Sequence, residues 1–116
     1  MNIEDARIYC LDKPGATEDF PFDETTLAFR VENRIFAIVD LEYTKWFCVK
    51  CNADYAIELR DKYPQITPAW HMNKKYWNQL DIAALNDELF YSLIDHSYNE
   101  VLKKLPKKIR TKYGLE

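Results

Sequence analysis

Three cysteines, two histidines and one aromatic-rich stretch are the residues of this chain whose types suggest chemistry. Cys48 and Cys51 form a C-x-x-C pattern, which is typical of a redox site or of half a zinc site. A zinc site needs about four ligands, and no second pair is present. Residues three apart in a strand face opposite sides, so a strand over 45–51 would separate the two thiols. We therefore expect structural cysteines. Redox chemistry is the alternative, because Cys51 directly precedes a predicted helix start.

The stretch PAWHMNKKYWNQL, residues 68–80, combines aromatic, basic and amide side chains in a pattern that favours a hairpin. Residues 68–72 and 76–82 are predicted to be extended, with residues 73–75 as the turn between them. Alternation along the two segments then predicts one shared buried face. The residues expected on that face are Trp70, Met72, Tyr76, Leu80 and Ile82.

His71 is the residue of this stretch that can exchange a proton near neutral pH. We interpret His71 and Asn73 as partners of the turn backbone. Alternatively, they converge with Trp77 on a cleft for a small ligand. Trp77 falls opposite Tyr76, so it either covers the edge of His71 or stands exposed for a partner. No nucleophile is paired with a base and no phosphate-binding glycine loop is present, so we expect neither an enzyme nor a cofactor.

Length and composition indicate one globular domain over residues 1–116. The chain is 47% hydrophobic and 15% aromatic, which is typical of a folded protein with its own core. No apolar run approaches the roughly 20 residues of a membrane span, and the first residues do not resemble a signal peptide. We expect a cytoplasmic monomer with no membrane contact.

Charge is unevenly distributed along the chain, whose overall net charge is −3. Residues 1–44 carry 4 basic and 10 acidic side chains, whereas residues 103–112 carry six basic side chains and no acid. Such a basic run is typical of a polyanion-binding surface, or of a solvated last turn of a helix. If the acidic residues of 1–44 lie on a different face from the basic residues, a positive surface results. If acidic and basic residues alternate on one face, their charges cancel.

Periodicity predicts an antiparallel sheet with helices packed on one face, an α+β fold of two layers with the order α-β(3)-α-β(2)-α. Helices are expected over 2–12, 53–63 and 86–105, with Asn2, Asn52 and Asn86 as their N-caps. Strands are expected over 25–31, 34–42 and 45–51, followed by the hairpin of residues 68–82. Residues 16–24 read as an acidic loop and residues 107–116 as a short basic tail.

Three segments together resemble the MmcQ/YjbR family. HMNKKYW (71–77) after Pro68 matches the pattern H-[ML]-N-K-x-[HYW]-W, YCLDKPGATEDFPF (9–22) resembles the first helix with its K-P-G, and LIDHSYNEVLKKLPKKIR (93–110) resembles the closing helix. The resemblance covers nearly the whole chain in consistent order. It implies a two-layer domain like that of type III secretion chaperones. It also implies DNA binding through a double wing of hairpins.

The leading functional hypothesis is therefore DNA binding through the hairpin turn and the basic C-terminal segment. Arg34, Lys50 and the basic residues from Lys103 onward could extend a positive strip, and an exposed Tyr76 or Trp77 could stack on a base. The candidate nucleic-acid-binding residues are His71, Asn73, Lys74, Lys75, Trp77, Lys107, Lys108 and Arg110.

The alternative is a protein-interaction adaptor that binds an extended partner segment. A sheet edge can accept an added strand, and the chaperone-like fold implied by the resemblance binds such segments. The surface expected for this role surrounds Phe20, Phe22, Tyr43 and Trp46.

Overall fold

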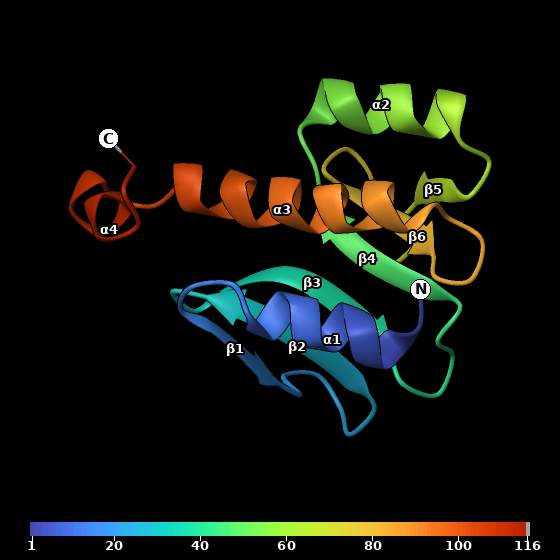
Figure 1. Cartoon of the computed structure of the whole chain (residues 1–116), viewed down its shortest axis with the longest axis horizontal. Helices are drawn as coiled ribbons and strands as arrows, with labels where there is room; N and C mark the ends of the chain where they lie inside the picture. The colour runs from blue at the N-terminus through green and yellow to red at the C-terminus, as the bar shows by residue number, and fades with distance from the viewer. Residues whose placement is uncertain (116) are drawn as a thin grey trace.

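The structure is a computed structural model that describes residues 1–115. Figure 1 shows an antiparallel sheet with helices packed over one of its faces. The sheet has six strands in the order β1-β2-β3-β4-β6-β5, so the predicted α+β class is confirmed. The strands are β1 (Ala16–Asp19), β2 (Thr26–Val31), β3 (Arg34–Asp40), β4 (Trp46–Lys50), β5 (Ile66–Pro68) and β6 (Trp77–Asp81). The helices are α1 (Ile3–Leu11), α2 (Ala53–Lys62), α3 (Asp87–Lys103) and α4 (Lys107–Lys112).

The helix-covered face of the sheet carries the core. Leu27, Phe29 and Val31 of β2 are buried there, as their alternation predicts. They pack with side chains of β3 and β4 beneath α3, where Phe47 and Phe90 have ring centroids 5.4 Å apart. Burial of these apolar side chains is the main term that stabilises the two layers.

The predicted element order omits β1 and α4. Residues 16–19 have the composition of a polar loop, yet they pair antiparallel with β2 as an edge strand. Arg7 binds Glu18 through two hydrogen bonds of 2.8 and 2.6 Å, and Arg30 contacts Asp19 at 3.0 Å. Ion pairs thus hold an edge strand that lacks the apolar pattern of the others.

The three predicted asparagine caps are confirmed. Asn2 accepts a hydrogen bond from the amide of residue 5, Asn52 from those of residues 54 and 55, and Asn86 from that of residue 89. These bonds satisfy amides that have no partner within a helix. Local sequence therefore determines where each helix begins.

The second hairpin is present, but its strands are shorter than the predicted ones. The strands are β5 and β6, and residues 69–76 form a loop in which the Met72 amide donates to the Ala69 carbonyl at 3.3 Å. Because of this turn, side chains after Pro68 no longer alternate between the two faces of the sheet. The prediction that Trp70 packs in the core is wrong, because its side chain is 67% exposed. Met72 is half-buried, whereas Leu80 and Ile82 are buried as expected.

No helix within residues 1–115 has the length and apolar character that crossing a membrane would require.

Gly15 lies in the turn between α1 and β1 with a φ of 73°, and a Cβ built there would lie 2.6 Å from the Tyr113 hydroxyl oxygen. We predict that Gly15→Ala lowers the free energy of unfolding by about 2–3 kcal/mol through backbone strain and displacement of Tyr113. Chemical denaturation measures this loss. Gly114→Ala is the control, since Gly114 has a similar φ of 77° but open space around it. Equal losses in the two variants would contradict the steric part of the prediction.

His96 of α3 links that helix to the start of α2. Its Nε2 accepts a hydrogen bond of 3.1 Å from the Asn52 amide, and its ring packs edge-on against Tyr55. Burial lowers the pKa of His96 from 6.5. The unfolded chain therefore binds the proton more readily than the folded chain.

We predict that this histidine makes no pH-dependent contribution well above pH 6.5 and destabilises the protein as the pH falls through that value. Melting temperatures measured between pH 8 and pH 5 test this. In His96→Gln, whose amide oxygen can accept the same bond without titrating, the decrease should be shallower. An identical pH dependence in the variant would contradict the assignment.

Candidate functional site

The sheet face opposite the helices carries a shallow groove. The cross-strand register places Ile38 of β3, Cys48 of β4 and Gln79 of β6 side by side on this open face. Thr67 of the edge strand β5 continues the row, and its hydroxyl accepts a hydrogen bond of 2.9 Å from the Gln79 side-chain amide. This row, from Ile38 to Gln79, forms the groove floor.

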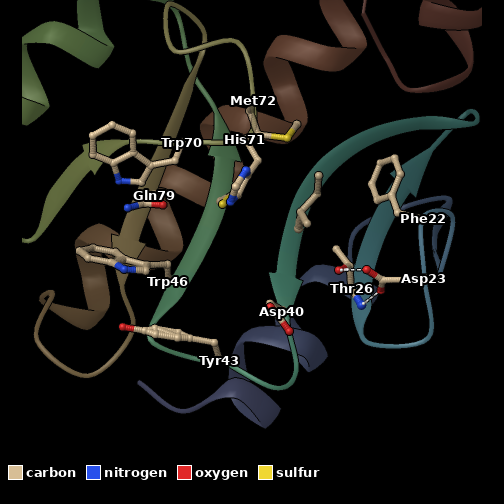
Figure 2. A pocket seen from close by; sticks show the side chains of 12 residues that line it. Phe22, Asp23, Thr26, Asp40, Tyr43, Trp46, Trp70, His71, Met72 and Gln79 are labelled. Atoms are coloured by element: carbon tan, nitrogen blue, oxygen red, sulfur yellow. Dashed lines mark hydrogen bonds between the residues drawn. The ribbon is translucent and has the colours of Figure 1, made fainter.

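Aromatic side chains from separate loops and strands surround this floor. Figure 2 shows Trp70 and Trp46 on one side of the groove and Phe22 on the other, with His71 between them. The groove has a volume of about 520 Å³, which is in the range of ligand sites. We call it the aromatic groove, and its lining residues are Phe22, Asp23, Thr26, Ile38, Asp40, Tyr43, Trp46, Cys48, Trp70, His71, Met72 and Gln79.

The loop of residues 69–76 forms one wall of the aromatic groove. Asn73 shapes it, because its Oδ1 accepts a hydrogen bond of 3.1 Å from the Lys75 amide and its carbonyl accepts one of 3.0 Å from the Tyr76 amide. The interpretation is therefore confirmed for Asn73, whereas the His71 side chain makes no hydrogen bond to the turn backbone within residues 1–115. The Lys74 ammonium lies 4.7 Å from the Trp70 ring centroid, so a cation accompanies the most exposed aromatic ring of this wall.

The opposite end of the aromatic groove is acidic. Asp23 accepts hydrogen bonds of 2.9 and 2.6 Å from the amides of Thr25 and Thr26, which lower the pKa of its carboxyl group. Asp40 accepts a hydrogen bond of 2.9 Å from the Glu42 amide. Both carboxylates thus order the loops at this end.

Four basic side chains gather beyond the other end of the groove. Arg34, Lys50 and Lys104 line a second depression together with Arg30, which pairs with Asp19 at 3.0 Å. The ammonium groups of Lys75 and Lys104 each lie 5.4 Å from the centroid of the Tyr76 ring. We call Arg34, Lys50, Lys75 and Lys104 the basic cluster. Within residues 1–115, none of the four forms an ion pair within 4 Å.

The pKa of Lys50 is sensitive to the positive charges of this cluster. Partial burial lowers the pKa of Lys50, and the charges of Lys104 and Arg34 lower it further. Glu100 acts in the opposite direction, but its carboxylate pairs with Lys103 at 2.7 Å. Neighbouring positive charges disfavour the protonated form of Lys50, so a bound anion would stabilise that form.

The basic cluster and the aromatic groove adjoin each other. Met72 lines both depressions. Lys50 and Cys48 lie on the same strand two residues apart, and they point to the same face, which separates their backbone positions by about 7 Å. A single ligand can therefore contact the basic cluster and the aromatic groove together.

The structure brings together only part of the predicted site. His71, Lys74 and Lys75 lie at the aromatic groove and the basic cluster, and Arg34 and Lys50 join them as the predicted strip requires. Trp77 is only 9% exposed, so it lies beneath the cluster and cannot stack on a base.

The C-terminal candidates lie on α4, outside the basic cluster. Arg110 donates a hydrogen bond of 2.8 Å to the Leu105 carbonyl, so its guanidinium helps to end α3. Lys107 and Lys108 are exposed. Two further tryptophans line the groove. Alternation predicts that Trp70 is buried in the core, and Trp46 is expected on the surface of a protein-interaction adaptor.

The predicted small-ligand cleft of His71, Asn73 and Trp77 does not form as such. His71 lines the aromatic groove, but Asn73 is in the turn and Trp77 is beneath the cluster. The groove instead contains Phe22 and Asp23 from the loop before β2 and Tyr43 from the loop before β4. These loops are far apart in the sequence, so no local motif predicts that they meet.

The two cysteines of the C-x-x-C lie on opposite faces, as a strand requires. Cys48 lines the groove, whereas Cys51 belongs to the core. Burial raises the pKa of Cys48 to about 11 and that of Cys51 to about 12. Both thiols are protonated at neutral pH, which disfavours redox chemistry. Residues 1–115 contain no cluster of three or more potential metal ligands.

The YjbR family model matches residues 11–100. The chain belongs to the YjbR family. It is 30% identical over 112 residues to the protein YjbR of Escherichia coli K12, covering 95% of each chain, and 27% identical over 107 residues to YbdF of Escherichia coli O157:H7, covering 90% of this chain and 88% of that protein.

Two crystal structures share this YjbR fold. The Deinococcus radiodurans protein DR2400 has a TM-score of 0.90 and 33% identity, covering 99% of this chain and 89% of its own. A Pseudomonas syringae protein has a TM-score of 0.70 and 25% identity, covering 84% of this chain and 96% of its own. These likenesses establish the family and its fold.

The K-P-G segment of this YjbR family chain has a structural explanation. Lys13 pairs with Asp95 of α3, and its ammonium lies 4.8 Å from the centroid of the Tyr9 ring. The Tyr9 hydroxyl donates a hydrogen bond of 2.7 Å to the same carboxylate. The segment therefore ties α1 to α3 on the helix side, away from the aromatic groove.

Proposed function

We propose that this YjbR family protein binds nucleic acid through the open face of its sheet. The observation that supports this most is the basic cluster, in which side chains from β3, β4, the 69–76 loop and the C-cap of α3 meet, and none of the four forms an ion pair among the described residues. The two acidic residues that line the aromatic groove, Asp23 and Asp40, lie at the end away from the basic cluster. Phosphate oxygens are the ligands that such a cluster of lysine and arginine attracts.

The basic cluster also supports a quantitative expectation. Four phosphate contacts would give a slope of about −3 for the logarithm of affinity against the logarithm of salt concentration with a single strand. That slope corresponds to a loss of about 60-fold between 50 and 200 mM salt. The protein's own net charge of −3 works against long-range attraction, so the expected affinity is micromolar rather than nanomolar.

Fluorescence anisotropy of labelled DNA tests this function. A 12-nucleotide thymidine oligonucleotide and a duplex of the same length would be titrated with protein at 50 and 200 mM salt. Micromolar binding with a steep salt dependence is the expected result. Absence of binding to either DNA at 50 mM salt, with the fold confirmed by circular dichroism, would overturn the proposal.

We also propose that the protein acts by binding rather than by catalysis. His71 and Cys48 both line the aromatic groove, but burial keeps Cys48 protonated at neutral pH. A protonated thiol is a poor nucleophile. The groove therefore offers contacts for a ligand without an activated thiol.

A protein-interaction adaptor is the second candidate. The observation that favours it is the exposure of Phe22 and Tyr43 at the acidic end of the aromatic groove, where a cationic and apolar peptide would find both contacts. If the protein is an adaptor that does not bind nucleic acid, adding an oligonucleotide should leave its affinity for the peptide unchanged. Competition between a peptide partner and an oligonucleotide would show whether both use this groove.

A further inference from the structure

We infer that the aromatic groove accepts unstacked bases, so that the protein prefers single-stranded over double-stranded nucleic acid. This inference rests on the proposed function and adds the class of nucleic acid. It follows from three features: one exposed and one half-buried tryptophan in the groove, opposite charges at the two ends of β3, and a recessed floor between the two loops.

Trp70 and Trp46 supply stacking surfaces. Trp70 is 67% exposed although it is large and apolar, and Lys74 lies over its ring at 4.7 Å. Trp46 is half-buried and has the ammonium of Lys45 5.1 Å from its ring centroid. Aromatic side chains with cations beside them are the elements that single-strand-binding proteins combine, because every base has a face that can stack.

The charges at the two ends of β3 define where phosphate and base would lie. Arg34 and Asp40 are the first and last residues of β3, about 20 Å apart along the strand. Phosphates are attracted to the Arg34 end and repelled from the Asp40 end. The nucleic-acid backbone would therefore cross the strands at the basic cluster, and its bases would extend along the strands into the aromatic groove.

A duplex fits this arrangement poorly. Its bases are stacked and paired inside the helix, so they can reach the groove floor only after unstacking. The 69–76 loop and the loop carrying Phe22 stand on either side of that floor (Figure 2). A duplex would contact the basic cluster alone, through phosphates, and a single strand would contact both the cluster and the groove.

Tryptophan substitution separates the two contributions. Trp70→Ala should weaken binding of the 12-nucleotide oligonucleotide by about 10-fold or more and change duplex binding less than about twofold. Trp70→Phe, which keeps a stacking ring, should restore most of the affinity. Phe20→Ala is the matched control, because Phe20 is an exposed aromatic residue that does not line the groove.

The outcomes distinguish this inference from the proposed function. Wild-type binding with no effect of Trp70→Ala, or with equal losses for oligonucleotide and duplex, would overturn the base-stacking groove and leave phosphate binding intact. Absence of binding to both DNAs would overturn both. Trp70 is exposed, so a melting temperature unchanged within a few degrees should confirm that the variant remains folded.

Adenosine gives a second readout that does not depend on phosphate. It should quench tryptophan fluorescence of the wild-type protein, and Trp70→Ala/Trp46→Ala should abolish the saturable part of that quenching. The response should be unaffected in Lys75→Glu/Lys104→Glu, which alters only the basic cluster. Adenosine quenching that does not saturate would overturn the inference.

Discussion

Lys75→Glu/Lys104→Glu is expected to weaken oligonucleotide binding at least 10-fold at 50 mM salt. Both side chains are exposed and lie over the same Tyr76 ring, so the substitution should leave the core intact. Removing two phosphate contacts should reduce the steepness of the salt slope by about 1.4 for a single strand. Anisotropy titrations at four salt concentrations measure both quantities.

Lys107→Glu/Lys108→Glu is the matched control for this double substitution. It changes the net charge by the same amount, but the two lysines lie on α4 and outside the basic cluster. A loss of about twofold or less is expected from the change in overall charge. An equal loss in both variants would instead place the phosphate contacts on the C-terminal segment or on no particular surface.

Ser97→Ala is expected to lower the free energy of unfolding by about 2–4 kcal/mol, a decrease of about 10–20 °C in melting temperature. Ser97 is fully buried in α3. Its hydroxyl donates a hydrogen bond of 2.6 Å to the Phe36 carbonyl of β3 and accepts one of 2.8 Å from the Lys50 amide of β4. Alanine would leave both backbone groups without this buried partner.

Ser92→Ala provides the control within the same helix. Ser92 is exposed, and its hydroxyl donates to the Leu89 carbonyl at 2.8 Å, so its removal should cost less than about 0.5 kcal/mol. Denaturant unfolding of the two variants gives the comparison. A stability loss in Ser97→Ala no larger than that in Ser92→Ala would contradict the bridging role. Because Ser97 holds the Lys50 backbone, we also expect reduced oligonucleotide affinity in the folded fraction.

Local sequence determined the elements that could be predicted. Asn2, Asn52 and Asn86 cap helices through bonds to their own neighbours, so a short pattern contains the whole cause. The apolar alternation of β2 likewise reflects one buried face. No local pattern predicts β1, because its stability comes from pairing with β2 and from ion pairs to other segments.

The candidate site was only partly predictable for the same reason. Lys74 and Lys75 follow from the turn signal of Asn73, and Arg34 and Lys50 follow from the expected positive strip. Alternation extended past Pro68 predicts Trp70 in the core, but a turn begins there and exposes the side chain.

The aromatic groove itself arises from tertiary structure. It requires the register that aligns β3, β4 and β6 and the two loops that stand over them. No spacing in one sequence specifies that juxtaposition. The signal that was present is compositional: aromatic residues such as Phe22, Tyr43 and Trp46 in polar segments, where burial in the core does not explain them.

Amide and indole NMR spectra of ¹⁵N-labelled protein, titrated with the 12-nucleotide thymidine oligonucleotide, would locate bound DNA on the surface of the protein. Chemical-shift changes are expected at Lys50 and the indole groups of Trp46 and Trp70 on the open sheet face, and at Lys75 and Lys104 of the adjoining basic cluster. The helix-covered side, including α1 and α2, should remain unchanged. Shifts confined to α4 or to the helix side, or none with the DNA in excess, would contradict binding through the open face of the sheet.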